Sequence, residues 1–252
     1  MPYLLNLWTW TVTVLVVLVG FVWVSLVFLV TAPFDAGRYA AGWTFRKLAV
    51  VQVALNPFWR FSTTGVRVHD PRHPYVAVAN HESYADIFLL SHLPWEMKWL
   101  SKDTIFRIPV LGWMMSMAGD VRLVRGNRSS AMDALAACRD RLQKRVSVMI
   151  FPEGTRSRGD DLLPFKDGAF RLAVEMGVPI LPIALAGTRH AMAKGSFRFR
   201  RAEAHCVVLE PVPTTGLTID DVPTLKEMVR ARIGEAREAL RRELAGHSWA
   251  RD

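Results

Sequence analysis

The sequence predicts an α/β layered domain that follows an N-terminal, helical membrane-anchoring segment. The first 34 residues hold no charged side chain and are dominated by Leu, Val, Trp and Phe. From residue 58 onward, short β-like apolar runs alternate with stretches of helical periodicity, which is the pattern of an α/β domain. We therefore expect an anchor over residues 1–57 and a second domain over residues 58–252.

The apolar run over residues 4–30 is long enough to enter a membrane as a helix. At 1.5 Å per residue it measures ~40 Å, more than the ~30 Å hydrocarbon core of a bilayer and far more than the apolar part of a secretory signal, ~7–15 residues. Arg38, Arg46 and Lys47 follow the run and no Lys or Arg precedes it. Positive residues mark the cytoplasmic side, so we expect the second domain in the cytoplasm, attached to the cell membrane.

A second helical segment is expected over residues 36–55, after a break at residues 33–35. Its pattern is typical of an amphipathic, interfacial helix whose polar side chains face water. Whether the two segments span the bilayer or dip into one leaflet as a hairpin stays open. The apolar positions are Trp43, Leu48, Val51 and Leu55, and the polar ones are Arg38, Arg46, Lys47 and Gln52.

The second domain is expected to alternate strands and helices and to end in a basic amphipathic helix over residues 225–244. This last helix has one apolar stripe, and its arginines, including Arg237, are expected in solvent on the other faces. The expected strands cover residues 66–69, 75–79, 97–101, 146–151, 180–184 and 206–209, and the other expected helices cover residues 84–92, 110–118, 129–144 and 168–175.

The charge and cysteine content limit the classes of partner that the protein is expected to have. Lys and Arg outnumber Asp and Glu by 32 to 23, a net charge of +9, which favours anionic partners such as phospholipid headgroups or phosphorylated metabolites. The arginines are scattered and no recognised nucleic-acid motif accompanies them, so no nucleic-acid partner is expected. Two cysteines, Cys138 and Cys206, form neither a disulfide framework nor a zinc-site spacing.

A histidine and an aspartate break the apolar run VANHESYADIF, at His81 and Asp86. Five residues apart in one helix, the two side chains would point about 140° apart. Ser83 followed three residues later by Asp86 is close to a capping box, which starts a helix near Tyr84 and leaves His81 in the preceding turn. From that turn the imidazole can meet the carboxylate. The alternative is a plain helix-start aspartate beside a loop histidine.

Two further stretches offer cations beside strands. FPEGTR, residues 151–156, follows the apolar run at 146–150, and GDVRLVR, residues 119–125, places two arginines in an apolar stretch. A glycine lets backbone approach a ligand, and an arginine fork binds phosphate through two hydrogen bonds. A phosphate site is the functional interpretation, and a solvated turn is the alternative.

Four blocks occurring in one order resemble the glycerolipid acyltransferase family, most closely its membrane-bound 1-acyl-glycerol-3-phosphate acyltransferases. The resemblance covers roughly residues 66–209, with LPFKDGAF at 163–170 as further support. It implies the family's glycerol-phosphate acyltransferase-like αβ fold, and an acyltransferase catalytic domain over residues 58–252. The four blocks are NHxxxxD at 80–86, GDVRLVR at 119–125, FPEGTR at 151–156 and VPILP at 178–182.

The resemblance also implies roles for individual residues. His81 matches the family's general base, and Asp86 matches the acid that orients it. Glu153, Gly154, Thr155 and Arg156 match the acceptor-binding block. Arg156 is then expected on the acceptor phosphate, aided by Arg122 or Arg125, where the family often carries a lysine. No metal and no cofactor is implied.

The implied reaction moves a fatty acyl group from acyl-CoA or acyl carrier protein to the sn-2 hydroxyl of 1-acyl-glycerol-3-phosphate, giving phosphatidic acid. Its expected partners are lysophosphatidic acid, the acyl thioester and membrane lipids, with acyl carrier protein as one of the two donors. Two alternatives stay open: acylation of another lyso-lipid, such as a lyso-ornithine lipid or another lysophospholipid, and a non-catalytic lipid-binding protein on the same fold.

Overall fold

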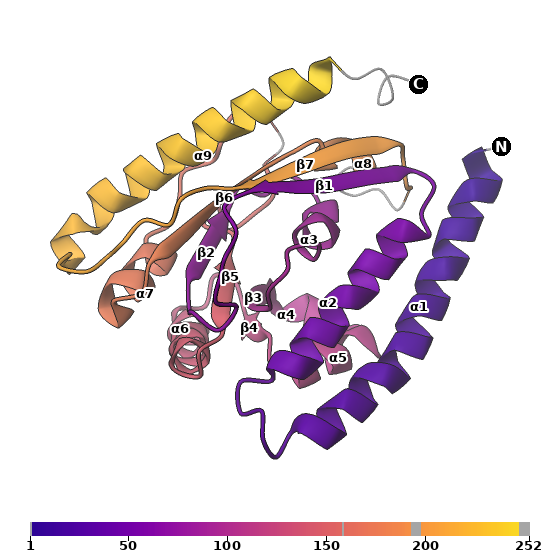
Figure 1. Ribbon diagram of the computed structural model, residues 1–252, viewed down its shortest axis with the longest axis horizontal. Coiled ribbons are helices and arrows are strands. Elements are labelled where there is room, and N and C mark those ends of the chain that lie inside the picture. Colours follow the sequence, from indigo (N-terminus) through magenta and orange to yellow (C-terminus); the bar gives the residue numbers. More distant parts are fainter. Residues whose placement is uncertain (1, 158, 193–197, 247–252) are drawn as a thin grey trace.

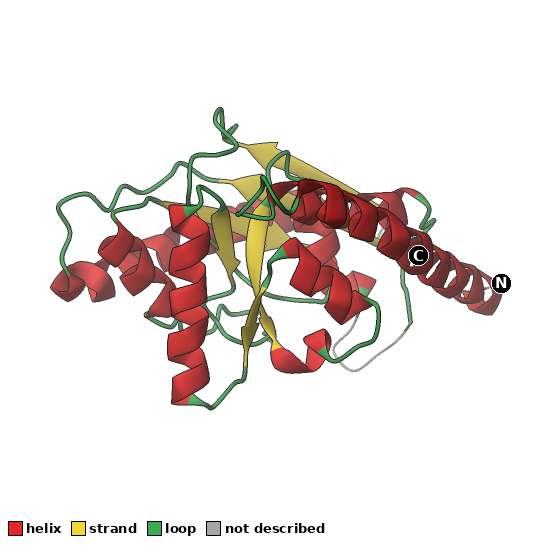
Figure 2. Cartoon of the chain, turned by 90° about the horizontal axis from the view of Figure 1, so that it is seen from below, coloured by secondary structure: helices red, strands yellow, loops and turns green. Residues whose placement is uncertain are grey.

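The computed structural model describes residues 2–157, 159–192 and 198–246. Residues 247–252 of the second expected domain therefore lie outside the described residues. One twisted sheet runs through the molecule and carries helices on both faces (Figures 1 and 2). The first two helices lie together on one side of the sheet, and the long C-terminal helix lies on the other (Figure 1).

Seven strands of the described chain form the sheet. They are β1 (Trp59–Gly65), β2 (Val76–Ala79), β3 (Met97–Lys102), β4 (Val121–Leu123), β5 (Ser147–Ile150), β6 (Ile180–Ala186) and β7 (Ala202–Val208). Their order is β1-β7-β6-β2-β5-β3-β4. All neighbouring pairs are parallel except β6 and β7, which are antiparallel. The carboxyl ends of β6, β2, β5, β3 and β4 consequently meet at one edge of the sheet.

Helices of the described chain pack around this sheet. They are α1 (Pro2–Thr31), α2 (Tyr39–Ala54), α3 (Ala85–Leu90), α4 (Asp103–Phe106), α5 (Leu111–Ala118), α6 (Arg128–Gln143), α7 (Gly168–Met176), α8 (Thr188–Ala191) and α9 (Val222–Ala245), with a short 3-10 turn at Ile219–Asp221. Alternate residues of a strand face opposite sides, so Val76 and Val78 pack in the layer of α6, α7 and α9, while Ala77 and Ala79 pack in that of α3.

The α/β class and most expected elements are confirmed, but the expected strand at residues 66–69 is wrong. The first strand is β1, which ends at Gly65 with φ +96. That conformation suits glycine alone, so the chain turns out of the ladder there. β1 contains the polar residues Ser62, Thr63 and Thr64, which give no apolar run. Val66 and Val68, which were predicted to form a strand, lie outside β1 and pack their side chains on the core. The other expected strands and helices form, while β4, α4 and α8 were not anticipated.

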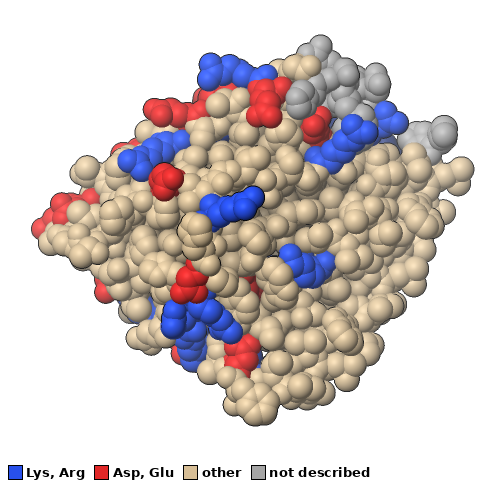
Figure 3. Space-filling model, in the orientation of Figure 1, with Lys and Arg blue, Asp and Glu red and all other residues tan. Residues whose placement is uncertain are grey.

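Helix α1 is the one helix of the described residues that is long and apolar enough to cross a membrane. A narrow stripe that includes Thr9, Val12 and Val24 is buried, and most of the remaining apolar side chains are exposed. The surface over α1 and α2 is almost free of charge in Figure 3. Such an unbroken exposed apolar surface is what a membrane-associated helix presents.

Helix α2 departs from the expected amphipathic arrangement, because polar side chains of the segment point inward. Arg46 is 6% exposed and pairs with the buried Asp120, and Gln52 is 3% exposed and donates from Nε2 to Thr13 Oγ1 at 2.8 Å. Val51 and Leu55 are instead 45% and 46% exposed. The expectation that Arg46 and Gln52 face water is therefore wrong. Each finds a partner inside the molecule, which a buried charge or amide requires.

Candidate functional site

The candidate site lies at the edge of the sheet where parallel strands end. His81 follows β2, Phe151 and Glu153 follow β5, and Thr188 follows β6. Open α/β sheets bind ligands at the carboxyl ends of their strands, where the chain leaves the regular ladder and side chains of several strands converge.

Asn80 fixes the start of the turn that carries His81. Its buried side chain accepts from the Leu185 N–H at 2.8 Å and donates to the Leu185 carbonyl at 3.0 Å. The β2–β6 register ends at Ala79 opposite Ile183, so the Asn80 amide continues the pairing by two hydrogen bonds after the backbone has turned away. The first residue of the turn is thereby held to β6.

His81 and Asp86 form the contact that the sequence predicted. Nδ1 of His81 lies 2.7 Å from Oδ2 of Asp86, and the same oxygen accepts the main-chain N–H groups of Glu82 and Ser83 at 2.8 and 3.0 Å. Asp86 is in the first turn of α3, so its carboxylate folds back over the turn that precedes the helix. With the carboxylate ionised, Nδ1 carries the proton and Nε2 presents a free lone pair.

The His81 ring is held from two sides. Its face stacks on Phe151, with the ring centroids 4.0 Å apart, and its main-chain N–H donates to Oε1 of Glu153 at 2.7 Å. Its carbonyl accepts the N–H of Ser157 at 2.9 Å. The imidazole side chain is 11% exposed and lines a cavity. Both the backbone and the ring of His81 are therefore fixed by neighbours on β5's exit loop.

Glu153 does not line this cavity. It is 4% exposed, and its second carboxylate oxygen accepts the N–H of Leu163 at 3.0 Å. Burial raises the pKa of this carboxyl, and the N–H groups of His81 and Leu163 partly oppose that rise. The geometry makes Glu153 a tie between the His81 turn and the loop before α7, which differs from the substrate contact expected from the sequence.

The cavity has a volume of about 560 Å³, and both basic and apolar side chains line it. The basic ones are Lys102, Arg125, Arg156 and Lys166, and the Arg156 guanidinium lies over the Tyr84 ring at 3.7 Å. The apolar ones include Trp99, Leu100, Ile105, Leu123, Leu135, Ile150 and Phe151. His81 lines the same cavity, so an imidazole, four cations and apolar side chains are brought together.

The structure separates the two arginines that the sequence could not rank. Arg125 lines the cavity. Arg122 does not, because its guanidinium lies 3.4 Å from Asp103 and over the Phe106 ring. Gly154 and Thr155 line the cavity, and Gly154 has φ +69, a conformation that favours glycine.

Two cavity lysines were missed by the sequence analysis. Lys102 is the last residue of β3, and Lys166 lies in the LPFKDGAF block. A signal was present in both cases, since one cation ends a strand at the site's edge of the sheet and the other lies in a block that supports the family resemblance.

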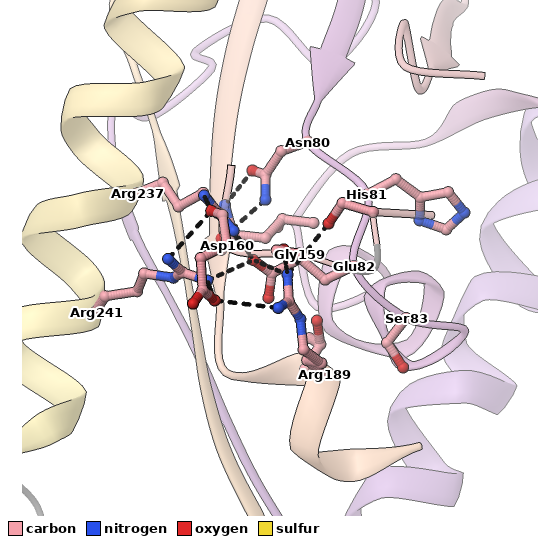
Figure 4. A network of polar contacts seen from close by, with 12 residues as sticks. Asn80, His81, Glu82, Ser83, Gly159, Asp160, Arg189, Arg237 and Arg241 are labelled. Atoms are coloured by element: carbon pink, nitrogen blue, oxygen red, sulfur yellow. Dashed lines mark hydrogen bonds and ion pairs between the residues drawn. The ribbon is translucent and has the colours of Figure 1, made fainter. Parts of the chain in front are cut away.

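A buried ion pair behind the His81 turn was also missed. Glu82 is 4% exposed and pairs with Arg237, which is 2% exposed, so the expectation that Arg237 faces solvent is wrong. Figure 4 shows Arg237 and Arg241 reaching from α9 toward Glu82 and Asp160, while the His81 ring points away from them. The spacing of Arg237 on α9 gave no signal, because its partner is 155 residues away.

The chain is similar to a family model, to curated proteins and to a solved structure. A family model described as Acyltransferase matches residues 60–186. A chloroplastic 1-acyl-sn-glycerol-3-phosphate acyltransferase of Brassica napus is 43% identical over 145 residues, which is 57% of this chain and 42% of that relative. The 1-acyl-sn-glycerol-3-phosphate acyltransferase alpha of Homo sapiens is 32% identical over 212 residues, 82% of this chain and 75% of the relative.

The chain thus spans less than half the length of the plant relative and three quarters of the human one. Among solved structures, the crystal structure of the 1-acyl-sn-glycerophosphate (LPA) acyltransferase PlsC from Thermotoga maritima has a TM-score of 0.79 at 26% identity, over 98% of this chain and 97% of that one. Since the family model, the human relative and this fold all agree, the chain belongs to the acyltransferase family.

Proposed function

We propose that the protein transfers a fatty acyl group from acyl-CoA or acyl carrier protein to the sn-2 hydroxyl of 1-acyl-glycerol-3-phosphate, giving phosphatidic acid. The observation that carries the proposal is the His81 imidazole, hydrogen-bonded to Asp86, at a cavity lined by both basic and apolar side chains. The names of the relatives give the same acceptor.

In the proposed step, Nε2 of His81 accepts the hydroxyl proton while the oxygen attacks the thioester carbonyl carbon. The carbon–sulfur bond then breaks, and the departing thiolate takes the proton from the imidazolium. A positioned general base contributes about 10²- to 10⁴-fold to such a step. Asp86 holds the Nδ1 proton and stabilises the positive ring while it exists. The acyl group passes directly from sulfur to oxygen, and no covalent acyl-enzyme is formed.

The basic side chains of the lining fit the phosphate of the acceptor. Arg156 offers a planar fork, and its stacking on Tyr84 fixes the plane of that fork. Arg125, Lys102 and Lys166 add positive charge around the same cavity. The apolar side chains of the lining, which include Trp99 and Leu135, fit a fatty acyl chain.

The location proposed is the cell membrane, with the catalytic domain on the cytoplasmic side. The exposed apolar surface of α1 supports the attachment. Arg38 and Lys47, which follow α1, support the orientation, whereas Arg46 is buried and adds nothing to it. A lyso-lipid acceptor remains in the bilayer while the thioester donor is in the cytosol, so a site beside the inner leaflet reaches both.

The test is transfer of a labelled acyl group from palmitoyl-CoA or oleoyl-CoA, and in parallel from acyl carrier protein, by membranes that contain the protein. The acceptors are lysophosphatidate, a lyso-ornithine lipid and a neutral-headgroup lysophospholipid. His81→Ala membranes serve as the inactive reference, and His190→Ala membranes control for the loss of a histidine outside the cavity lining.

Phosphatidate formed from lysophosphatidate by the wild type and the His190→Ala variant, and lost in His81→Ala, is the expected result. A His81-dependent product from another acceptor alone would replace the substrate and retain the reaction. If neither donor gave any His81-dependent product, acyl transfer would be excluded and the lipid-binding alternative would stand.

A further inference from the structure

We propose that Arg237 of α9 is a positioning residue for the His81–Asp86 pair, acting through the buried carboxylate of Glu82. The inference rests on the proposed acyl transfer for its kinetic consequence only. Its electrostatic consequence at His81 is measured without any substrate, so the two proposals fail separately.

Glu82 stands between the two candidate catalytic residues and the C-terminal helix. Its main-chain N–H donates to Oδ2 of Asp86 at 2.8 Å, and it directly follows His81 in the chain. Its side chain turns to the opposite side, where Nε and Nη2 of Arg237 both lie 2.8 Å from Oε1. A movement of Glu82 therefore displaces the carboxylate that orients the imidazole.

Arg237 also holds the loop that follows the acceptor-binding block. Its Nη1 donates to the Asp160 carbonyl at 2.6 Å. Arg189 and Arg241 reach the Asp160 carboxylate at 3.2 and 2.9 Å and approach Glu82 at 3.9 and 4.0 Å (Figure 4). The N–H of Ser157 in this loop donates to the His81 carbonyl. Arg237 is therefore connected to the His81 turn in two ways, through Glu82 and through this loop.

Because Glu82 and Arg237 are both almost completely buried, their charges act strongly on neighbouring groups. The side chains of Glu82 and Arg237 are 3% and 2% exposed, so water screens neither charge well. Burial raises the pKa of Glu82, and the positive charge of Arg237 opposes that rise. Burial also raises the pKa of Glu153, and the Arg237 charge opposes that rise too. Arg237 thus balances two carboxylates that flank His81.

Charged groups surround the Glu82–Arg237 pair from each neighbouring element and contribute to the field at His81, together with the cavity residues Lys102, Arg125, Arg156 and Lys166. Asp86 faces Glu82 from α3, and the remaining groups around the pair come from α8, α9 and the loops after β5. They are Arg189, Arg237, Glu238, Arg241, Glu153 and Asp160. If Arg237 is removed, the negative charge of Glu82 is less compensated and stabilises the His81 imidazolium. If the Glu82 charge is removed, the imidazolium is destabilised.

The first experiment is an NMR titration of the His81 imidazole in the full chain in detergent, with its signal assigned by the His81→Ala variant. Arg237→Met should move the titration midpoint up, because Glu82 keeps Arg189 and Arg241 as nearby positive charges and stays ionised, and Glu82→Gln should move the midpoint down. The double variant should return it close to the wild type, since the two charge changes cancel.

Arg230→Met is the matched control. Arg230 lies two turns away on α9 and bonds the Leu162 carbonyl at 2.9 Å, so it helps hold the same loop, but it makes no contact with Glu82 among the described interactions. Its removal should leave the His81 midpoint unchanged. An equal shift in Arg230→Met would mean general loosening of α9 and would overturn the proposal.

The second readout is acyl transfer by the same variants. Arg237→Met should lower kcat by about 10-fold with the KM values of donor and acceptor within about 2-fold, because the catalytic pair is displaced and the cavity lining is not. The acid limb of the kcat profile should follow the NMR midpoints. If Arg237→Met does not fold, Glu82→Gln still tests the proposal, because glutamine has nearly the volume of glutamate and lacks its charge. A His81 midpoint unmoved in Glu82→Gln would refute the electrostatic role, whatever the activity.

Discussion

Thr188 donates its hydroxyl hydrogen bond to Oδ1 of Asp86, the oxygen that His81 does not use. The two carboxylate oxygens of Asp86 are therefore divided between β6's exit and the His81 turn. A carboxylate accepts on both oxygens, whereas an amide presents donors on one side. In Asp86→Asn the amide oxygen can keep the partners of Oδ2, and the N–H₂ group then faces Thr188, whose hydroxyl can accept. The substitution therefore removes the negative charge beside the His81 ring.

We expect Asp86→Asn to lower kcat by about 10²- to 10⁴-fold, with little change in either KM, because the ring loses the negative charge that stabilises the imidazolium formed during the reaction. Initial rates at several donor and acceptor concentrations measure the split. Asp140→Asn, which removes a half-exposed carboxylate on α6, should retain wild-type rates. A kcat within 3-fold of wild type in Asp86→Asn would contradict the assigned role.

Arg125 and Arg122 belong to one block but face different surroundings, which gives a matched pair of variants. Arg125→Met should raise the KM for lysophosphatidate by about 10-fold, the cost of one charge-assisted phosphate contact, and leave the KM for a neutral-headgroup acceptor unchanged. Arg122→Met breaks the contacts with Asp103 and with the Phe106 ring, both outside the cavity lining, and should change the KM by less than about 2-fold. The reverse ranking would place the phosphate at Arg122.

Arg46 and Lys47 are adjacent cations on α2, and Arg46 is buried whereas Lys47 is only partly buried. Arg46→Met removes the guanidinium beside the buried Asp120 and should lower the free energy of unfolding by about 3–5 kcal/mol. Lys47 lies over the Trp43 ring at 3.9 Å, and Lys47→Met should cost about 1 kcal/mol or less. Chemical unfolding in a mild detergent compares the two, and equal losses would show that Arg46 has no special role.

The two cysteines give a test of direct transfer. Burial raises the pKa of the Cys138 thiol to about 12 and also raises that of Cys206, and both side chains are fully buried. At pH 8 the thiolate fraction of Cys138 is then about 10⁻⁴, and the thiolate is the reactive form. N-ethylmaleimide should label neither cysteine in the folded protein and should not inactivate it, whereas denatured protein should take up two labels. Rapid inactivation of the folded enzyme would point to a reactive thiol.

Local chemistry made much of the fold and site predictable. The apolar runs became β2, β5 and β6 because buried parallel strands need continuous apolar residues. The His81–Asp86 contact followed from a helix start placed between them, a relation within six residues of chain. Features of this kind depend on neighbours in sequence and can be read from it.

The remaining features depend on partners that are distant in sequence. β1 is an edge strand paired only with β7, and its Ser62 and Thr63 give no apolar run. Arg46 was assigned to water because Asp120, its partner, lies 74 residues away. Arg237 was misplaced for the same reason, since a cation and its buried carboxylate leave no periodic trace along the chain.

The two hydrogen bonds between Asn80 and Leu185 tie the exchange of one amide hydrogen to the state of the candidate site. The Leu185 N–H donates to the Asn80 side chain, so it becomes open to solvent only when the turn that carries His81 separates from β6. Amide protection reports the free energy of such local opening. The Leu185 amide is consequently a built-in probe, whose exchange rate measures how often the His81 turn comes loose in a protein that carries no label.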